Sequence, residues 1–250
     1  MDKGITNKYI DYLKNLPEKN RYTINDLLVD DLLIDYEKNF KIYYSPFDFI
    51  NMNAKLIIVG ITPGFTQMEI AVRYFKKEML LKKSINEILE NVRKEAAFAG
   101  TMRKNLINML DQINVNTIFG INSCNLLFEN INFELIHATS LIRYPVYNEG
   151  KNYTGYSPDI LSSDLLRKYV LDNFLEEIKK INFSLIIPLG TSVSKVLKWI
   201  SKYHFNIEEK CLFEFPHPSG ANGHRLKIFN EKKDDYINII KNIKKSNNVT

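Results

Sequence analysis

Four short, almost continuously apolar runs recur along this chain. They are Lys55–Gly60, Leu135–Ser140, Ser184–Leu189 and Cys211–Phe215. Runs of this length with apolar residues at successive positions are typical of β-strands that are covered on both faces, as in a parallel sheet. We therefore predict strands at these four positions.

Stripes with helical spacing lie between these runs. One begins after Gly190, with Thr191 or Ser192 as its N-cap, and another has Ser163 or Asp164 as its cap. The core-facing positions of three such stripes are Val193, Val196, Leu197 and Ile200; Leu166, Tyr169, Val170, Phe174 and Ile178; and Leu106, Met109, Leu110 and Ile113. Strands that alternate with helices predict an α/β fold, here a three-layer αβα sandwich with a central, mostly parallel four-stranded sheet.

Length and composition favour one domain. The chain has 250 residues, of which 45% are hydrophobic, and this is enough for a full-sized core. Because no linker-like stretch, long charge block or repeat divides the sequence, we predict a single domain over residues 1–250. Residues 1–50 are expected to form an N-terminal extension packed on it, and residues 241–250 a frayed polar tail.

Charge and cysteine content narrow the class of protein. The net charge is +5, which suits a polyanionic partner but is shared by many unrelated proteins. Cys124 and Cys211 are isolated, which indicates a reducing compartment and is too few for a four-cysteine zinc or iron–sulfur site. The N-terminus has no apolar signal region, and apolar stretches such as Leu56–Val59 are too short to span a bilayer. We predict a soluble cytoplasmic protein without a membrane partner.

The segments that follow the predicted strands carry the candidate chemistry, because ligands of open α/β sheets bind beyond the carboxyl ends of the strands. Gly60–Gly64 (GITPG) follows the first run and brings Thr62 to the sheet edge, without the Gly-Lys-Ser/Thr of a P-loop. Residues 216–225 (PHPSGANGHR) follow the fourth run and gather His, Ser, Asn and Arg between prolines and glycines. This concentration of hydrogen-bond donors suits an anionic ligand, with phosphates and a developing negative charge as its targets.

Aromatic residues near the second run allow two interpretations. Ser140–Pro145 (SLIRYP) follows that run, and Asn152–Tyr156 (NYTGY) forms a later loop. Aromatic rings interleaved with Arg and Lys suit stacking and backbone contact with an unpaired strand, but tyrosines in a long loop equally pack that loop down. The segment Tyr43–Phe47 (YYSPF) leaves a similar choice between lining the entrance to a pocket and simple packing.

Several segments, taken in order from about Ala54 to about Arg225, resemble the uracil-DNA glycosylase superfamily. They correspond to its first motif, its base-stacking Phe segment, the strand that ends in a base-reading Asn, its third strand and its His-Pro-Ser loop. In the same order they are Gly60–Gly64, Phe98-Ala99-Gly100, His137–Pro145, Ser184–Gly190 and His217-Pro218-Ser219. The resemblance implies that DNA is the partner and that a nucleotide is flipped out of the helix for cleavage of its N-glycosidic bond.

Three positions depart from the family pattern. Thr62 stands where most branches have Asp, Asn or Glu to position or activate water, and Ser140 stands where many have the base-reading Asn. Gly64 stands where the uracil-strict branch has a Tyr that excludes a 5-methyl group. A Thr hydroxyl cannot act as a carboxylate base, so the sequence leaves three possibilities open. Thr62 orients a water, Glu69 or Glu95 takes over, or the chemistry has been lost.

The resemblance implies catalytic, base-binding and DNA-contacting roles for particular residues of these segments. Thr62 and His217 are the catalytic candidates, with His217 donating to the charge that develops on the departing base. The base-binding candidates are Ile61, Gly64, Phe98 and Ser140. The candidates for contact with DNA are Ser219, Gly220, Asn222, His224, Arg225, Arg103, Lys104, Arg143 and Tyr153.

The departures also bear on the substrate. A Ser hydroxyl reads a base edge less strictly than an Asn amide, and Gly64 removes bulk near the pyrimidine C5 position. We therefore expect a monomeric, monofunctional DNA glycosylase that excises a damaged or modified base, such as a 5-substituted cytosine in phage DNA, as a defence. The resemblance implies no metal, no iron–sulfur cluster and no other cofactor. The alternatives are a uracil-excising repair glycosylase, a catalytically inactive module that recognises modified bases, and a hydrolase of free nucleosides or nucleotides.

Overall fold

A computed structural model describes residues 3–98, 100–129 and 132–247 of the chain. Ala99 of the predicted Phe98-Ala99-Gly100 segment lies outside these residues. The chain divides into two compact units. Unit 1 comprises Met1–Ile50, Ile61–Ala97 and Ser140–Glu176, and unit 2 comprises Asn51–Gly60, Phe98–Thr139 and Glu177–Thr250. Each unit is therefore assembled from stretches that are distant in the sequence.

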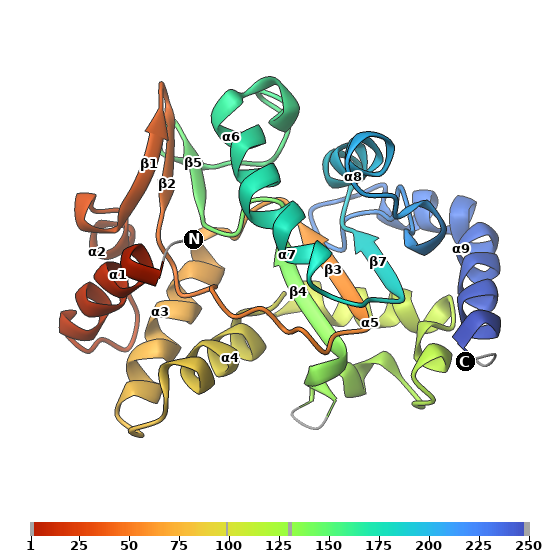
Figure 1. Cartoon of the computed structure of the whole chain (residues 1–250), viewed down its shortest axis with the longest axis horizontal. Helices are drawn as coiled ribbons and strands as arrows, with labels where there is room; N and C mark the ends of the chain where they lie inside the picture. Colours follow the sequence, from red (N-terminus) through yellow and green to blue (C-terminus); the bar gives the residue numbers. More distant parts are fainter. Residues whose placement is uncertain (1–2, 99, 130–131, 248–250) are drawn as a thin grey trace. The chain divides into compact units, whose positions relative to one another are not determined.

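Unit 2 contains the predicted parallel sheet (Figure 1). Strand β3 (Leu56–Gly60) lies between β4 (Ile136–Ser140) and β7 (Leu185–Pro188), and it pairs with β7 in parallel over Leu56–Val59. The side chains of Leu56–Val59 are fully buried, as the unbroken apolar run requires of a strand that is covered on both faces. The α/β architecture predicted from the sequence is confirmed.

The prediction of a fourth strand is wrong. Within the described chain, Cys211–Phe215 forms only a single parallel bridge, from Cys211 to Ile186. The sheet of unit 2 therefore has three strands instead of four. A turn within the run prevents further pairing. Glu214 has a φ of 65°, in the left-handed region that ends an extended strand, and the Phe215 N–H turns back to the Leu212 carbonyl oxygen at 3.3 Å.

The helices of unit 2 bear the predicted stripes. Helix α7 (Glu176–Lys179) passes in front of the sheet and α5 (Thr101–Gln112) behind it in Figure 1. Leu106, Met109 and Leu110 of α5 are buried, as are Val193, Val196, Leu197 and Ile200 of α8 (Thr191–Tyr203). Short 3₁₀ helices at Val115–Ile118, Cys124–Phe128, Phe133–Leu135 and Glu208–Lys210 complete the unit, together with α9 (Arg225–Asn247).

The ends of two helices differ from the sequence-based expectation. The N-cap of α8 is Gly190, not Thr191 or Ser192, because its φ of 98° is one that glycine adopts without steric cost. Helix α9 continues through Asn247, past Lys241, where the sequence indicates a frayed tail. No helix in the described parts of the chain is long and apolar enough to cross a membrane.

Unit 1 is built on a second, antiparallel sheet that the apolar runs did not predict. Its strands, in the order β1-β2-β5-β6, are Leu33–Glu37, Phe40–Tyr43, Val146–Asn148 and Lys151–Asn152. Its helices are α1 (Lys3–Asn15), α2 (Ile24–Leu27), α3 (Phe65–Met79), α4 (Ile85–Ala96) and α6 (Asp164–Tyr169), with a 3₁₀ turn at each of Asp30–Leu32 and Ile160–Ser162. The predicted cap of α6 is confirmed at Ser163, whose Oγ accepts the Leu166 N–H at 3.2 Å, and the helix continues as a π-helical segment over Val170–Leu175.

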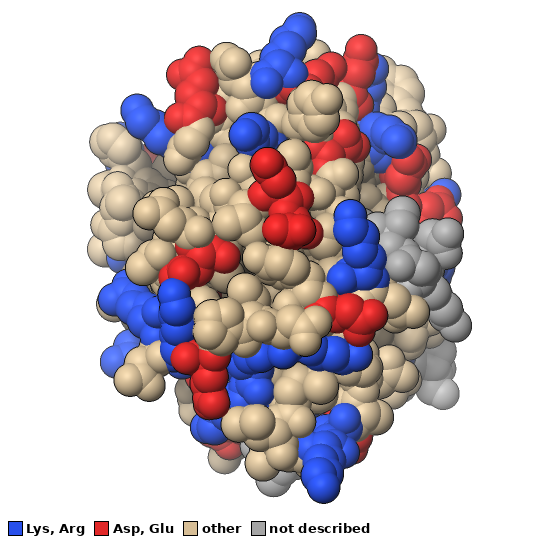
Figure 2. Space-filling view, turned by 90° about the vertical axis from the view of Figure 1, so that its left-hand side faces the viewer, with Lys and Arg blue, Asp and Glu red and all other residues tan. Residues whose placement is uncertain are grey.

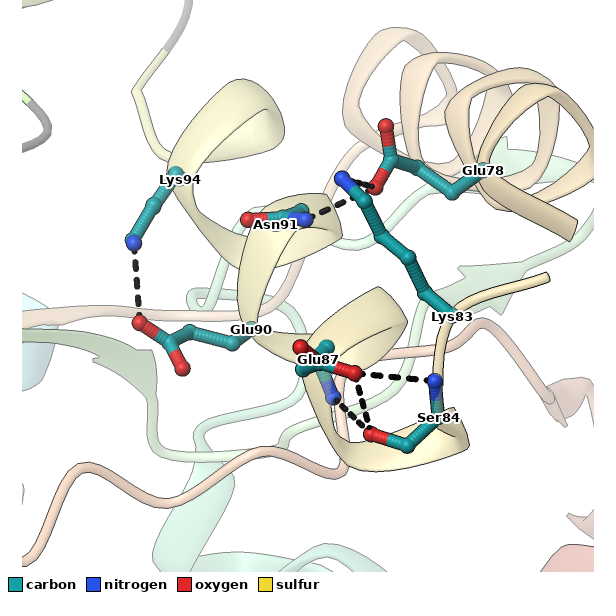
Figure 3. Close-up of polar contacts among 7 residues, drawn as sticks. All are labelled: Glu78, Lys83, Ser84, Glu87, Glu90, Asn91 and Lys94. Atoms are coloured by element: carbon teal, nitrogen blue, oxygen red, sulfur yellow. Dashed lines mark hydrogen bonds and ion pairs between the residues drawn. The ribbon is translucent and has the colours of Figure 1, made fainter. Parts of the chain in front are cut away.

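Polar contacts fix the turn between α3 and α4 (Figure 3). The buried Glu78 carboxylate accepts from Lys83 Nζ at 2.8 Å and from Asn91 Nδ2 at 2.7 Å. Ser84 and Glu87 form a capping box, in which the Ser84 N–H donates to Glu87 Oε2 at 2.9 Å and the Glu87 N–H donates to Ser84 Oγ at 3.3 Å. These bonds hold the helix pair that follows the GITPG turn.

The surface of unit 1 carries mixed charge. Figure 2 looks onto the side on which α1, α2 and β1 lie in Figure 1, and its basic and acidic side chains are interspersed. The surplus of positive charge is therefore not gathered into one field on this face.

Candidate active site

His217 of unit 2 lies in a loop whose start is fixed by Gly190. The Gly190 N–H donates to the Phe215 carbonyl oxygen at 2.8 Å, two residues before the histidine. A Cβ placed on Gly190 would lie 3.4 Å from His217 Cβ. The predicted strand-end glycine thus admits the His217 loop to the carboxyl end of β7 and also begins α8.

Replacing Gly190 with Ala is expected to destabilise the protein by about 1–3 kcal/mol, because its φ of 98° and ψ of 168° lie in a region that is essentially restricted to glycine. We also expect a slower reaction, since the added methyl group would lie directly against the Cβ of His217. Gly120→Ala is the matched control, because Gly120 has a φ of 65° but open space at its Cβ position. Urea unfolding and base excision are measured on both variants. Equal rates for the two would show that the contact with His217 is unimportant.

The His217 imidazole is held neutral and in one tautomer. It is half-buried, and this desolvation lowers the pKa of its ring below the ordinary 6.5. Its Nδ1 accepts the Ser219 N–H at 3.2 Å, so the single proton of the neutral ring is on Nε2. The side chain therefore presents a neutral N–H donor at Nε2.

The rest of the loop is braced by its own predicted DNA contacts. Arg225 Nη1 donates to the carbonyl oxygens of Pro218 at 3.2 Å and Ser219 at 2.7 Å, and Asn222 Nδ2 donates to the His217 carbonyl at 3.2 Å. Ser219 Oγ accepts the Ala221 N–H at 3.2 Å. These bonds give the loop a fixed shape, while the exposed Gly220 and His224 lie at its surface.

Helix α5 brings further predicted DNA contacts to this loop, within unit 2. Asn105 Nδ2 donates to the Pro218 carbonyl at 2.8 Å, and Arg103 and Lys104 lie in the first turn of the same helix. The Arg103 guanidinium lies over the Phe128 ring, 5.4 Å from its centroid. Phe98, just before α5, is 9% exposed and has a φ of 50°. Such a conformation is rare for a bulky residue, and strain of this kind concentrates at functional sites.

In unit 1, the Thr62 hydroxyl is committed to the backbone. It donates to the Tyr144 carbonyl oxygen at 2.7 Å and accepts the Val146 N–H at 3.1 Å. Its hydroxyl proton is therefore used, and it retains one acceptor position. The bonds join the GITPG turn to the Ser140–Pro145 segment, which the sequence predicted to lie at the same sheet edge.

Replacing Thr62 with Val is expected to cost about 1–3 kcal/mol of stability, because the Tyr144 carbonyl and the Val146 N–H lose their partner. Thr62→Ser retains both hydrogen bonds and should match the parent in urea unfolding and in excision rate. A Val variant as stable as the parent would contradict this account of the hydroxyl.

The predicted base-binding residues of unit 1 lie around the same turn. The Ile61 carbonyl oxygen accepts the Ile142 N–H at 3.0 Å, and Ser140 is the half-buried last residue of β4. Gly64 is the N-cap of α3, and its N–H donates to Gln67 Oε1 at 3.1 Å. A Cβ at Gly64 would lie 3.1 Å from that same oxygen, so a side chain here would displace Gln67.

Two predicted DNA contacts of unit 1 are buried. Tyr153 is 5% exposed, its ring packs edge-on against Phe40 at 5.3 Å, and its hydroxyl donates to the Pro158 carbonyl. This is the packing alternative that the sequence left open. Arg143 is 7% exposed and lies beside Tyr144, whose pKa is raised well above 10 by burial although the charge of Arg143 opposes that rise.

The carboxylates that the sequence offered as substitutes for Thr62 differ in burial. Glu69 is buried in unit 1, where Oε1 accepts from Arg73 Nε at 2.8 Å and from the Tyr22 N–H at 3.3 Å. Glu95 is exposed on α4. The Glu69 carboxylate is thus engaged in holding α3 to the N-terminal segment.

Sequence reasoning missed a third carboxylate in unit 1, Asp48. It follows the aromatic segment Tyr43–Phe47 and accepts hydrogen bonds from the hydroxyls of Tyr44, at 2.7 Å, and Tyr144. Both tyrosines are fully buried. The signal in the sequence is a single Asp between Phe47 and Phe49, in a run whose aromatic rings alone entered the prediction.

Unit 2 also has an open hollow of about 760 Å³ at the amino ends of its strands, lined in part by Lys55, Ser184 and Ile243. In α/β sheets the ligand edge is at the carboxyl ends of the strands. The described residues contain no group of three or more His, Cys, Asp or Glu placed to hold a metal ion.

Comparison with known proteins agrees with the motif order. The model of the family described as "Uracil DNA glycosylase superfamily" matches residues 47–241. The chain belongs to this superfamily. A relative 40% identical over 229 residues, covering 89% of each chain, is the uncharacterized protein YoxB of Bacillus subtilis (strain 168). Among solved structures, wild-type Pedobacter heparinus SMUG2 is similar, with a TM-score of 0.41, 17% identity and 97% of each chain covered.

Membership of the uracil-DNA glycosylase superfamily supports DNA glycosylase activity, and hence DNA as the substrate. The matched range contains both groups of candidate site residues. In unit 1 these are the Thr62 turn with the Ser140–Pro145 segment, and in unit 2 the His217 loop with α5. The individual roles of these residues stay predictions.

Proposed function

We propose that this member of the uracil-DNA glycosylase superfamily is a monofunctional glycosylase that flips out and excises a damaged or modified pyrimidine. Hydrolysis breaks the bond between C1′ and the base, with oxocarbenium character on the sugar and negative charge on the departing base. The observation that carries the proposal is the neutral His217 ring, whose Nδ1 accepts the Ser219 N–H and whose Nε2–H is left as the donor.

A fixed, neutral donor suits this reaction. Charge develops on the base only as the bond breaks, so a preoriented N–H stabilises the transition state more than the ground state. Desolvation strengthens the interaction between the N–H and the developing charge, and it keeps the imidazole neutral at neutral pH. Phe98 is proposed to stack on the extruded base, and Arg103, Lys104, Ser219, Gly220 and His224 to contact the DNA backbone.

The preference for a modified pyrimidine rests on unit 1. Gly64 stands where the uracil-strict branch has a Tyr, so the bulk of that ring is absent here, and Ser140 offers one rotatable hydroxyl in place of an amide. A hydroxyl both donates and accepts, so it tolerates uracil-like and cytosine-like edges. We propose 5-substituted cytosines as the substrate class, with phage DNA that carries such bases as a biological target.

The test is a panel of otherwise identical duplexes that carry uracil, a thymine mismatch, 5-methylcytosine or a bulky 5-modified cytosine. Abasic sites are detected by alkaline strand cleavage after incubation with the full chain. We expect the bulky 5-modified cytosine to be excised fastest. Excision of plain uracil alone would identify a uracil repair enzyme and defeat the proposed preference.

The Thr62 hydroxyl is already hydrogen-bonded to the backbone of Tyr144 and Val146, and this favours a second candidate function. The protein would then be a catalytically inactive module that recognises modified bases. This candidate predicts salt-sensitive binding to the same duplexes without abasic products. It also predicts that the affinity for these duplexes does not change when His217 is replaced with Ala. Turnover of free nucleosides without DNA binding would instead identify a small-molecule hydrolase.

A further inference from the structure

Asp48 of unit 1 is a half-buried carboxylate held by two buried tyrosines. The Tyr44 hydroxyl donates to Oδ2 at 2.7 Å, and the Tyr144 hydroxyl donates to Oδ1. Both rings are fully buried, and burial raises the pKa of each hydroxyl well above 10, so both remain donors at neutral pH. The carboxylate is thus fixed in position from two sides.

The same tyrosine joins Asp48 to the family's first motif. The Tyr144 carbonyl oxygen accepts a hydrogen bond from the Thr62 hydroxyl at 2.7 Å, and the Tyr144 hydroxyl donates to Asp48. One residue therefore contacts both the position where the family usually places a water-activating side chain and a carboxylate from another segment. All three residues belong to unit 1.

The hydrogen-bonding capacities of Thr62 and Asp48 differ. The Thr62 hydroxyl already donates its hydrogen bond to the Tyr144 carbonyl oxygen, so it cannot also donate to a water. A hydroxyl is also too weak a base to take a proton from water at neutral pH. A carboxylate offers about four acceptor positions. The two tyrosines fill two of them, and the partial exposure of Asp48 leaves the others within reach of water.

We propose that Asp48 holds and deprotonates the water that attacks C1′ and thereby replaces the acidic or amide side chain that Thr62 displaced. This inference rests on the proposed function. In the step, the C1′–N bond breaks and its electron pair stays on the base, which takes a proton from solvent. The water oxygen bonds to C1′, and the proton that it loses passes to the Asp48 carboxylate, which then releases it to solvent. The products are the free base and an abasic site.

The first experiment compares Asp48→Asn with Asp35→Asn in the full chain. Asp35 is the matched control, because it also lies in unit 1 and accepts a tyrosine hydroxyl, that of Tyr169, at 3.4 Å. The rate is measured in single turnover with excess enzyme on the best duplex of the panel. Affinity is measured with a duplex that carries a tetrahydrofuran abasic analogue.

We expect Asp48→Asn to lower the single-turnover rate by about 10²–10⁴-fold, the usual contribution of a positioned base, and to leave the affinity within about threefold. Asp35→Asn should match the parent in both. An Asp48→Asn rate within about threefold of the parent would overturn the inference. The proposed function fails separately, if the parent itself forms no abasic sites on any duplex.

A second variant separates catalysis from folding. Asp48→Ala leaves space for a small carboxylate, so added sodium formate should restore part of its rate and should not help His217→Ala. Urea unfolding is followed on every variant. If Asp48→Ala folds and formate leaves its rate unchanged, the carboxylate is not the base. If both Asp48 variants unfold at low urea, the residue is structural and the inference is wrong.

Discussion

Replacing His217 with Ala is expected to lower the single-turnover rate of base excision by about 10²–10³-fold, the usual effect of removing one preorganised donor to a developing anion. The Ser219 N–H holds the imidazole with its proton on Nε2, and the half-buried ring is desolvated. Alanine removes that donor but leaves the bracing of the loop by Arg225 and Asn222, since both bond the backbone.

His204→Ala is the control for this variant. His204 lies in unit 2 at the end of α8 and packs against Trp199, with ring centroids 4.5 Å apart. It should keep the parent rate, and both variants should bind the tetrahydrofuran duplex about as tightly as the parent. A His217→Ala rate within about threefold of the parent would remove the main support for the glycosylase proposal.

The depressed pKa of His217 also makes stability depend on pH. The unfolded chain takes up a proton at this ring near the ordinary pKa of 6.5, whereas the folded ring takes it up only at lower pH. This contribution to stability is therefore fully present above pH 6.5 and is lost as the pH falls through the folded pKa. His217→Ala should lose less stability than the parent between pH 7 and about pH 5 in urea unfolding.

Replacing Glu177 with Ala is expected to cost about 3–5 kcal/mol of stability, because it removes one partner of a buried pair in unit 2. Glu177 and His137 are each 1% exposed, and His137 Nε2 lies 2.7 Å from Glu177 Oε1. His137 Nδ1 accepts the Asn51 N–H at 3.4 Å, so the ring donates from Nε2 to the carboxylate. Alanine removes the carboxylate that accepts from this buried N–H.

Glu177→Gln separates charge from hydrogen bonding, because its amide oxygen still accepts the imidazole N–H, and it should lose much less stability than Glu177→Ala. Glu209→Ala is the surface control in the same unit, since Glu209 is exposed. Urea unfolding gives all three values. A loss below about 1 kcal/mol for Glu177→Ala would show that the pair contributes little beyond specificity.

The parallel strands were predictable because their signal is local. An unbroken apolar run such as Leu56–Val59 has to be covered on both faces, whatever the rest of the chain does. Cys211–Phe215 is also mostly apolar, but the left-handed backbone at Glu214 converts it into a turn. That backbone is held from outside the run, by the hydrogen bond from the Glu214 N–H to Ser194 Oγ at 2.8 Å. Composition alone could not reveal it.

The antiparallel sheet of unit 1 escaped prediction for a related reason. Its strands are short and half-polar, and β2 pairs with β5, about 100 residues further along the chain, placing Phe40 opposite Asn148. Such pairing is decided by long-range contacts, which neither segment encodes by itself. Tyr153 illustrates the consequence, because its ring lies against Phe40 of that sheet.

The sequence by itself determined the α/β class, the three parallel strands, the stripes of α5 and α8, and the membership indicated by GITPG and the His-Pro-Ser loop. These features depend on neighbours in the chain. Only the tertiary structure decided how the polar groups are used, with Thr62 bonded to the backbone and Asp48 held by two tyrosines. A hydrogen bond needs a partner about 3 Å away, and Tyr144, which bonds both Thr62 and Asp48, comes from a segment some 80–100 residues further along the chain.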